Sequence, residues 1–454
     1  MPTPTLSRPF LSRRQFLQMA GLAGGLTLAA ACTPATTPDG QAPAADAGVP
    51  SAEATTITMW THDNLYVEFF NSRGEKWKAD HTDKTIEFDF QQIPYGEVFT
   101  KVLANLAAGS GAPDLVGIEI SVFSRFMKGD IADKGLVPFN DLIGDEKDKF
   151  LRWDPYTYKG NLYGVESALC PVGYWYQPAL FEKAGVELPA TWEEFAEAGV
   201  KLKEATNATL LPVDDLGAGL FNMLFQQRDQ HLFSEDGALT LNTPEAVEVL
   251  KFILDAANSS EVFFKTGADS YWGAATLTAY KDGAIAGAVM PDWYHTATLA
   301  GELKDMAGQW QLAKMPTWKN GSHKTSTWGG TGFGITKQSK DAPLVWDLLH
   351  YVYLTKEGQV ERFQQIGYYP HMIEAFTDPG VMDKAFEFCG GQKIGTIFAE
   401  VATDIPTQFQ SPFWEEAQRA LNDQITLAFA GDVGPEEAIQ AATDGIKTIM
   451  EKGA

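Results

Sequence analysis

The sequence predicts an α/β protein with two lobes. Runs rich in β-branched and aromatic residues alternate with runs that have the apolar spacing of helices. Short breaks containing Gly, Ser and Pro separate these runs, which is typical of a mostly parallel sheet covered by helices on both faces. About 400 residues follow the N-terminal segment, which is more than one core normally organises. We therefore expect two α/β lobes.

The first strands and helices are predicted in a regular order. Alternation in "TTITMWT" at 55–61 predicts a strand, and apolar spacing at Val67, Phe70 and Trp77 predicts the helix that follows. The next three expected elements are a strand in "KTIEFDFQQI", a helix in "EVFTKVLANLAA" and a strand from Leu115 to Ile118. Ligands of such sheets bind beyond the carboxyl ends of the strands. Residues 60–64 and 119–121 are therefore expected to meet at one crevice.

Two later helices carry clear start signals. Thr191 precedes an amphipathic run and has Glu194 three residues later, as in a capping box. Thr243 is placed to cap a second helix, with Pro244 at the first helical position. "SKDAPLVWDLLHYVYLT" and "GPEEAIQAATDGIKTIM" predict two further amphipathic helices.

The N-terminus has the pattern of an export signal. Arg13 and Arg14 precede a short apolar run that stops at Cys32, and this run is shorter than the roughly 20 residues of a membrane span. The paired arginines resemble a twin-arginine signal and "LAAAC" resembles a lipoprotein signal, so residues 1–31 are expected to be the signal and Cys32 the lipidated residue. An ordinary secretory signal, with Cys32 discarded or free, is the alternative. Residues 32–54 are rich in Ala, Pro and Thr and predict an extended linker.

Composition excludes several kinds of partner and site. The formal charge of −24, with no basic cluster in the body of the chain, argues against nucleic acid and disfavours polyanionic ligands. Cys170 and Cys389 could pair or stay thiols. No Cys/His spacing suggests zinc, and we expect neither a metal nor another cofactor.

Six segments in sequence resemble the extracellular solute-binding proteins of the carbohydrate class, the receptors of ATP-driven (ABC) sugar importers. The resembling segments are "ITMWTHD", "LAAGSGAPDLVGIE", "YKGNLYGVESALCPVGYWYQPALFEKAGVELPATWEEF", "AYKDGAIAGAVMPDWYHTA", "TWGGTGFGITKQSKDAPLVWDLLHYVYLTKEGQ" and "FWEEAQRALNDQITLAFAGDVGPEEAIQAATDGI". The resemblance implies a two-lobed, type II periplasmic-binding-protein-like fold with a hinged cleft between the lobes. It also implies that a permease of an ABC transporter receives the ligand.

The same resemblance implies where the chain passes between the lobes. The crossovers are expected near 165–168, 327–331 and 353–356. Lobe 1 would combine residues 55–166 with 331–353, and lobe 2 would combine 167–330 with 354–454. We expect a monomer that works outside the cytoplasm, on the outer face of the cell membrane or in a periplasm.

Candidate binding residues follow from what a neutral sugar requires. Flat aromatic faces cover its C–H surfaces, and carboxylates or amides bind its hydroxyl groups. Trp60, Asp63 and Glu119 follow strands of the first lobe, although Trp60 could be core and the carboxylates could be solvated. Tyr174 and Tyr176 alternate with Trp175 just after the first crossover, so at most two of the three share the cleft side.

Further candidates rest on the resemblance or on the crossovers. Asp292, Trp293 and Trp414 match positions that contact sugar in the family, and Tyr369 is a weaker candidate. Trp328, Gly329 and Gly330 lie on the second crossover, where glycines allow close approach or hinge motion; a tight structural turn is an equal alternative. The histidines considered, each expected to be polar wall or structural rather than metal-ligating, are His62, His295 and His371.

The favoured function is capture of a neutral mono- or oligosaccharide in the cleft. One alternative is a secreted glycoside hydrolase that uses Asp63 and Glu119 as its carboxylate pair. Another is a binding protein for a peptide, a metal or a cationic ligand such as a polyamine, which the acidic composition would suit. Neither a G-x-S-x-G elbow nor a P-loop occurs in the sequence, so we expect any ATPase to be a separate chain.

Overall fold

The structure is a computed structural model that describes residues 54–453. The predicted export signal, Cys32 and nearly all of the predicted linker lie outside the described residues. Within residues 54–453, no helix has the length and the apolar content needed to cross a bilayer.

One half of the described chain, here called lobe 1, is built on a five-stranded sheet. Its strands, in spatial order, are β2 (Ile86–Gln92), β1 (Thr55–Thr61), β3 (Leu115–Glu119), β12 (Thr331–Ile335) and β6 (Val165–Glu166). β1 runs parallel to β2 and β3, whereas β12 is antiparallel to both β3 and β6. The three predicted strands are thus confirmed. The parallel direction expected for the sheet holds for these three strands and also for β6, whereas β12 runs opposite to the other four.

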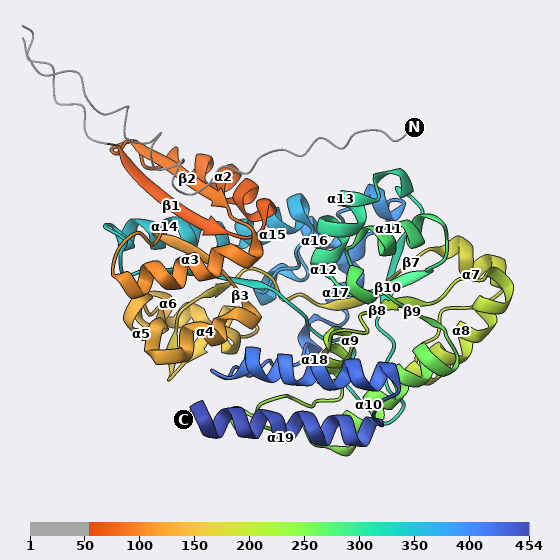
Figure 1. Cartoon of the computed structure of the whole chain (residues 1–454). Helices are drawn as coiled ribbons and strands as arrows, with labels where there is room; N and C mark the ends of the chain where they lie inside the picture. The colour runs from red at the N-terminus through yellow and green to blue at the C-terminus, as the bar shows by residue number, and fades with distance from the viewer. Residues whose placement is uncertain (1–53, 454) are drawn as a thin grey trace, which may run out of the picture. The chain divides into compact units, whose positions relative to one another are not determined.

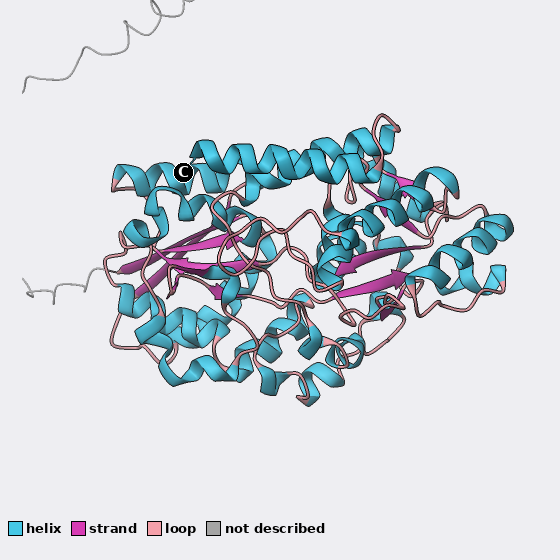
Figure 2. Cartoon of the chain, turned by 90° about the horizontal axis from the view of Figure 1, so that it is seen from below, coloured by secondary structure: helices cyan, strands magenta, loops and turns pink. Residues whose placement is uncertain are grey.

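Helices cover both faces of this sheet (Figure 2). The helices of lobe 1 are α2 (Asn64–Lys78), α3 (Tyr95–Ala108), α4 (Phe123–Met127), α5 (Ile131–Gly135), α6 (Asn140–Ile143) and α14 (Ala342–Tyr353), and a small hairpin joins β4 (Thr157–Tyr158) to β5 (Asn161–Leu162). The buried core of the lobe includes Met59, Phe70 and Leu115, together with Phe333 of β12. Strands and helices that are distant in sequence therefore share one apolar core.

The other half, lobe 2, is built on two smaller sheets. Its antiparallel sheet has the order β10 (Gly287–Pro291), β7 (Val172–Tyr176) and β11 (Gln311–Lys314), and β8 (Leu211–Val213) pairs in parallel with β9 (Phe263–Lys265). The helices around these sheets are α7 (Pro178–Ala184), α8 (Trp192–Thr206), α9 (Gly219–Gln227), α10 (Pro244–Leu254), α11 (Ala274–Lys281), α12 (Asp292–Tyr294), α13 (Ala300–Glu302), α16 (Pro379–Met382), α17 (Ile394–Ala399), α18 (Trp414–Ala430) and α19 (Pro435–Gly453). The last two lie side by side (Figure 1).

β7 separates two buried clusters of lobe 2. Tyr174 packs on one face with Phe195 of α8, and Trp175 packs on the other with Met290 of β10. This is the alternation expected of a strand, but both faces are interior. No side chain of β7 lines the cavity between the lobes, and only Tyr176, at the end of the strand, is partly exposed.

The predicted helix starts are confirmed. The side chain of Thr191 accepts a hydrogen bond from the backbone N–H of Glu194 at the start of α8, at 3.3 Å. Thr243 accepts one from Ala246 at the start of α10, where Pro244 is the first helical residue.

Three segments connect the lobes. The first leads from β6 of lobe 1 to β7 of lobe 2, and the second leads from β11 of lobe 2 back to β12 of lobe 1. The third leads from α14 of lobe 1 through α15 (Lys356–Ile366) to α16 of lobe 2. The buried guanidinium of Arg152 holds parts of these connections together. It forms an ion pair with Glu166 at 2.5 Å and donates hydrogen bonds to Thr327 Oγ1 (3.4 Å) and to the carbonyl oxygens of Leu169 and Pro406 (3.2 Å each).

Both cysteines of the described chain, Cys170 and Cys389, are buried free thiols. Burial raises the pKa of each thiol, to about 12 for Cys389. The disulfide that the sequence left open is therefore absent from the described residues.

Candidate ligand-binding site

A cavity of about 880 Å³ lies between the two lobes. Residues that follow β1 and β3 form one wall, residues of lobe 2 form the opposite wall, and Trp328 to Thr331 of the second connection lie between them. β1 and β3 are parallel, so their carboxyl ends meet at one edge of the sheet. The structure thus brings together Asp63 and Glu119, as the strand-end argument expected.

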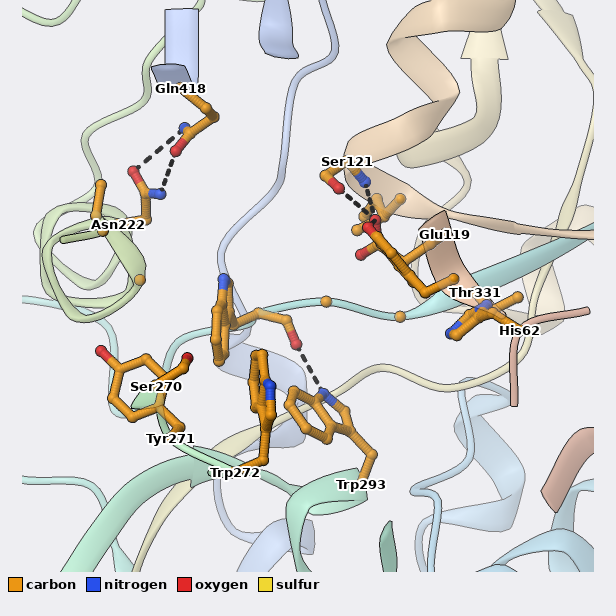
Figure 3. Close-up of a pocket in the computed structure, with 18 of the residues that line it drawn as sticks. His62, Glu119, Ser121, Asn222, Ser270, Tyr271, Trp272, Trp293, Thr331 and Gln418 are labelled. Carbon is orange, nitrogen blue, oxygen red and sulfur yellow. Dashed lines mark hydrogen bonds between the residues drawn. The ribbon is translucent and has the colours of Figure 1, made fainter. Parts of the chain in front are cut away.

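The lobe 1 wall presents Glu119 beside hydroxyl and backbone donors. Its carboxylate accepts hydrogen bonds from the backbone N–H of Ser121 at 2.8 Å and from the Ser121 hydroxyl (Figure 3). It also accepts one from Tyr95 Oη at 3.3 Å. Burial raises the pKa of Glu119 above its usual value, although these hydrogen bonds partly oppose the shift. A half-buried carboxylate of this kind is a strong acceptor for a ligand hydroxyl group.

Asp63 also faces the cavity, but it has structural partners. One carboxylate oxygen caps α2 by accepting from the Leu65 N–H at 2.9 Å, and the other accepts from Tyr368 Oη at 2.7 Å. Next to it, burial lowers the pKa of His62, with the negative charge of Asp63 opposing the shift. His62 is therefore expected to be neutral at pH 7 and to contribute a polar ring.

Three indoles lie together at the cavity: Trp272 and Trp293 belong to the lobe 2 wall, and Trp328 belongs to the second connection beside it. The rings of Trp272 and Trp328 are 6.4 Å apart and nearly parallel, and Trp293 lies 5.8 Å from Trp328. Trp272 is 53% exposed, and Figure 3 shows it beside Trp293 at the cavity. The indole N–H of Trp293 donates to the Trp328 carbonyl oxygen at 3.0 Å. This group, here called the indole wall, offers aromatic faces to a ligand.

Amide side chains also contribute to the lobe 2 wall of the cavity. Asn222 of α9 donates to the amide oxygen of Gln418 of α18 at 2.8 Å, and Figure 3 shows this pair at the cavity. Acidic side chains outnumber Arg419 in the lining, and Arg419 itself lies near Glu415 and Glu416 at 3.9 and 3.5 Å. Aromatic faces, amides and carboxylates are thus combined in one cavity, which is suited to an uncharged polyhydroxyl ligand.

Seven of the residues predicted from sequence line the cavity. They are Asp63, Glu119, Trp293, Trp328, Gly329, Gly330 and Trp414. Trp414 is 6% exposed and packs near Phe233 in the core of lobe 2, so most of its surface is structural. Gly329 and Gly330 have φ angles of 69° and 116°, which favour glycine.

Three predicted residues lie outside the cavity for reasons of strand packing. Trp60 is half-buried on the sheet under the ammonium group of Lys101 of α3, 3.9 Å from the ring centroid. Tyr174 is buried and donates to the Leu210 carbonyl oxygen at 2.8 Å. Tyr176 stacks near Tyr174 on the same side of β7 and is partly exposed, away from the cavity between the lobes. The expectation that these side chains face the cleft is corrected accordingly.

Two further predicted residues are buried behind the cavity. Asp292 is completely buried and accepts hydrogen bonds from backbone N–H groups, and Tyr369 packs between Phe363 and Phe376. His295 and His371 are likewise buried, and burial lowers the pKa of both, to about 4 for His295. Among residues 54–453 there is no group of three or more His, Cys, Asp or Glu side chains placed to hold a metal ion.

Sequence reasoning missed several lining residues. Trp272 lies in a turn before Gly273, outside any apolar periodicity, and that position was a usable signal of exposure. Asn222 and Gln418 carried no such signal, because an amide on a helix becomes a site residue only through the packing of α9 beside α18. Tyr95, Asn422 and Arg419 were missed for the same kind of reason.

Three comparisons with known proteins concern the family of this chain. The family model described as bacterial extracellular solute-binding protein matches residues 65–359. A protein of Halalkalibacterium halodurans named arabinooligosaccharide-binding protein is 28% identical over 88% of this chain and 90% of its own length. A protein of Bacillus subtilis with the same name is 25% identical over 87% of this chain and 92% of its own.

Solved structures resemble the whole described fold. The GacH receptor of Streptomyces glaucescens, solved unliganded and with acarbose, matches with a TM-score of 0.74 at 18% identity, over 88% of this chain and 99% of that chain. An ABC transporter associated binding protein from B. animalis subsp. lactis, in complex with β-1,6-galactobiose, has a TM-score of 0.72 at 20% identity, over 88% and 98% of the two chains. These likenesses confirm the two-lobed, type II periplasmic-binding-protein-like fold.

Proposed function

The chain belongs to the bacterial extracellular solute-binding proteins, and from this premise we propose that it captures a neutral oligosaccharide in the cavity between its lobes. The family consists of substrate-binding proteins rather than enzymes, and its members work outside the cytoplasm. The observation that carries the proposal is the indole wall facing Glu119 across one cavity. Aromatic rings can stack on the C–H faces of a sugar, and a carboxylate can accept hydrogen bonds from its hydroxyl groups.

The size of the cavity favours more than one sugar ring. Small-molecule pockets span about 300–1,000 Å³, and a cavity of about 880 Å³ is near the upper end of that range. The two relatives named arabinooligosaccharide-binding proteins make a short arabinose oligomer the first ligand to test.

Arabinotriose is expected to change the intrinsic tryptophan fluorescence saturably, because stacking changes the surroundings of the indole wall. The titration should be repeated with maltotriose, β-1,6-galactobiose and spermidine, and the sugar recovered afterwards should be chemically unchanged. A response to spermidine alone would contradict the sugar proposal and favour a cationic ligand, which the acidic lining would suit.

The hydrolase hypothesis does not agree with the family, whose members bind solutes without converting them. The placement of Asp63 points the same way, because both of its oxygens already accept hydrogen bonds from Leu65 and Tyr368. We therefore assign Asp63 a role in holding α2 and the cavity wall rather than in proton transfer.

We further propose that the lobes close over the ligand by hinge motion, with lobe 1 formed by residues 55–166 and 331–353 and lobe 2 by 167–330 and 354–454. A ligand that touches both walls stabilises the closed form selectively. Small-angle X-ray scattering during the arabinotriose titration should therefore show a smaller radius of gyration at saturation. An unchanged radius with bound sugar would contradict the hinge.

Lipid anchoring and delivery to the permease of an ABC transporter complete the proposal. Support comes from the sequence around Cys32 and from the family, whose relatives include proteins of ABC transporters. Changing Cys32 to Ser in the full chain, expressed in a bacterium that lipidates exported proteins, should move the protein from the membrane fraction to the soluble exported fraction. Retention in the membrane fraction would contradict anchoring at Cys32.

A further inference from the structure

Asp292 occupies a buried position directly behind the indole wall. It is 0% exposed and stands between the end of β10 and Trp293. One carboxylate oxygen accepts the backbone N–H of Trp293 at 2.7 Å, and the other accepts the backbone N–H of Tyr369 at 2.5 Å. The carboxylate thereby joins the start of α12 to the segment that follows α15.

Trp293 itself is held at a second point. Its indole N–H donates to the carbonyl oxygen of Trp328 at 3.0 Å, on the second connection between the lobes. Gly329 lies against the same ring, because a Cβ atom there would come within 3.3 Å of the indole nitrogen. The position of this indole therefore depends on two of the three segments that connect the lobes.

We propose that Asp292 is a positioning residue for sugar binding, which sets the place of Trp293 by accepting both backbone N–H groups at once and so ties the indole to the segment after α15. The inference rests on the proposed function, because it assumes that Trp293 contacts the sugar. Asp292 itself has no contact with the cavity.

The ionisation of Asp292 decides whether both N–H groups keep an acceptor. Burial raises its pKa to about 7, while the Tyr369 and Trp293 N–H groups and the charge of Arg362 oppose the shift. The titratable or charged side chains that face it from the surrounding segments are Arg362, Glu166, Cys170 and Tyr368. Above pH 7 the ionised carboxylate accepts both bonds, and below pH 7 the protonated oxygen becomes a donor. Sugar affinity is therefore expected to fall as the pH is lowered from 8 to 6.

Global stability is expected to move in the opposite direction. The folded state holds the proton up to about pH 7, whereas the unfolded chain loses it near 3.8, so the contribution of this group to folding is present below pH 4 and is lost as the pH rises to 7. If Asp292 only supported the fold, a change of pH would shift the sugar affinity and the free energy of unfolding in the same direction. Opposite slopes therefore distinguish positioning from general support of the fold.

The experiment follows the Trp293 indole N–H signal by NMR between pH 5.5 and 8.5 without sugar, with the signal assigned by a Trp293→Phe variant. In the wild type we expect a chemical-shift change with a midpoint near pH 7, which separates it from His295 with its pKa of about 4. In Asp292→Asn this titration should disappear, and arabinotriose affinity measured by calorimetry should fall about tenfold, because one buried N–H loses its acceptor.

Asp114→Asn is the matched control, because this carboxylate also accepts a backbone N–H, from Thr58 at 2.8 Å, but lies outside the cavity. It should leave the Trp293 signal and the sugar affinity unchanged. A Trp293 signal that does not titrate in the wild type, or wild-type affinity in Asp292→Asn, would overturn the inference. If the wild type binds no sugar, the proposed function fails, while the NMR titration still decides the positioning role.

Discussion

Replacing Trp293 by alanine should lower oligosaccharide affinity by about 30- to 1,000-fold, the range for truncating a tryptophan that anchors a binding site. Trp293 contributes an aromatic face to the cavity, and its ring also supports Trp328 at 5.8 Å. Because Trp293 is only half-buried, the loss of folding stability should be smaller than the about 3–5 kcal/mol typical of a fully buried tryptophan. Calorimetric titration with arabinotriose and urea unfolding of the same preparation would measure both effects.

Trp60→Ala is the matched control, since Trp60 is a half-buried tryptophan outside the cavity. It should retain wild-type affinity. Trp414→Ala is a poorer test of stacking than the sequence indicated, because Trp414 is 6% exposed and its removal would also open the core of lobe 2. Wild-type affinity in Trp293→Ala would remove this residue from the site.

Replacing Glu166 by glutamine should lower the free energy of unfolding by about 3–5 kcal/mol, because it leaves the guanidinium of Arg152 buried without a charged partner. The side chains of Arg152 and Glu166 are 5% and 2% exposed, and the guanidinium also bonds to Leu169, Thr327 and Pro406. The effect should be large because the pair stands where the segments connecting the lobes come together.

Urea unfolding measures this change, and Glu400→Gln supplies the comparison. Glu400 pairs with Lys314 at 2.9 Å, but both side chains are more than half exposed, so its loss should cost at most about 1 kcal/mol. The double variant Arg152→Met with Glu166→Leu should recover much of the stability lost in Glu166→Gln, since no unpaired charge remains. A loss of less than 1 kcal/mol in Glu166→Gln would show that the guanidinium is not dependent on this carboxylate.

Local patterns predicted individual strands and helices well, because apolar spacing and caps are short-range signals. The strand at Thr55–Thr61 and the cap at Thr191 are examples. Strand direction was predicted less well: β12 is antiparallel to β3, and β7 is antiparallel to both β10 and β11. Pairing of strands that are far apart in sequence depends on the whole core, which no local window contains.

The site shows the same division. Asp63 and Glu119 were reachable from sequence because the ends of parallel strands meet by geometry. The run at Tyr174 and Tyr176 misled, since alternation reports which residues share a face but not which face is solvent. Trp272 and the Asn222–Gln418 pair depend on how turns and helices pack, so three-dimensional structure was needed to find them.

The strand order of lobe 1 has a consequence for how the protein is made. β12 lies between β3 and β6, yet the ribosome synthesises it after every strand of lobe 2. Until residues 331–335 emerge, the nascent chain leaves the edge of β3 unpaired and β6 without a neighbour. The sheet of lobe 1, whose first strands are synthesised before lobe 2, is therefore completed only after the strands of lobe 2 have been synthesised. During translation the exposed edge of β3 needs protection from pairing with other chains.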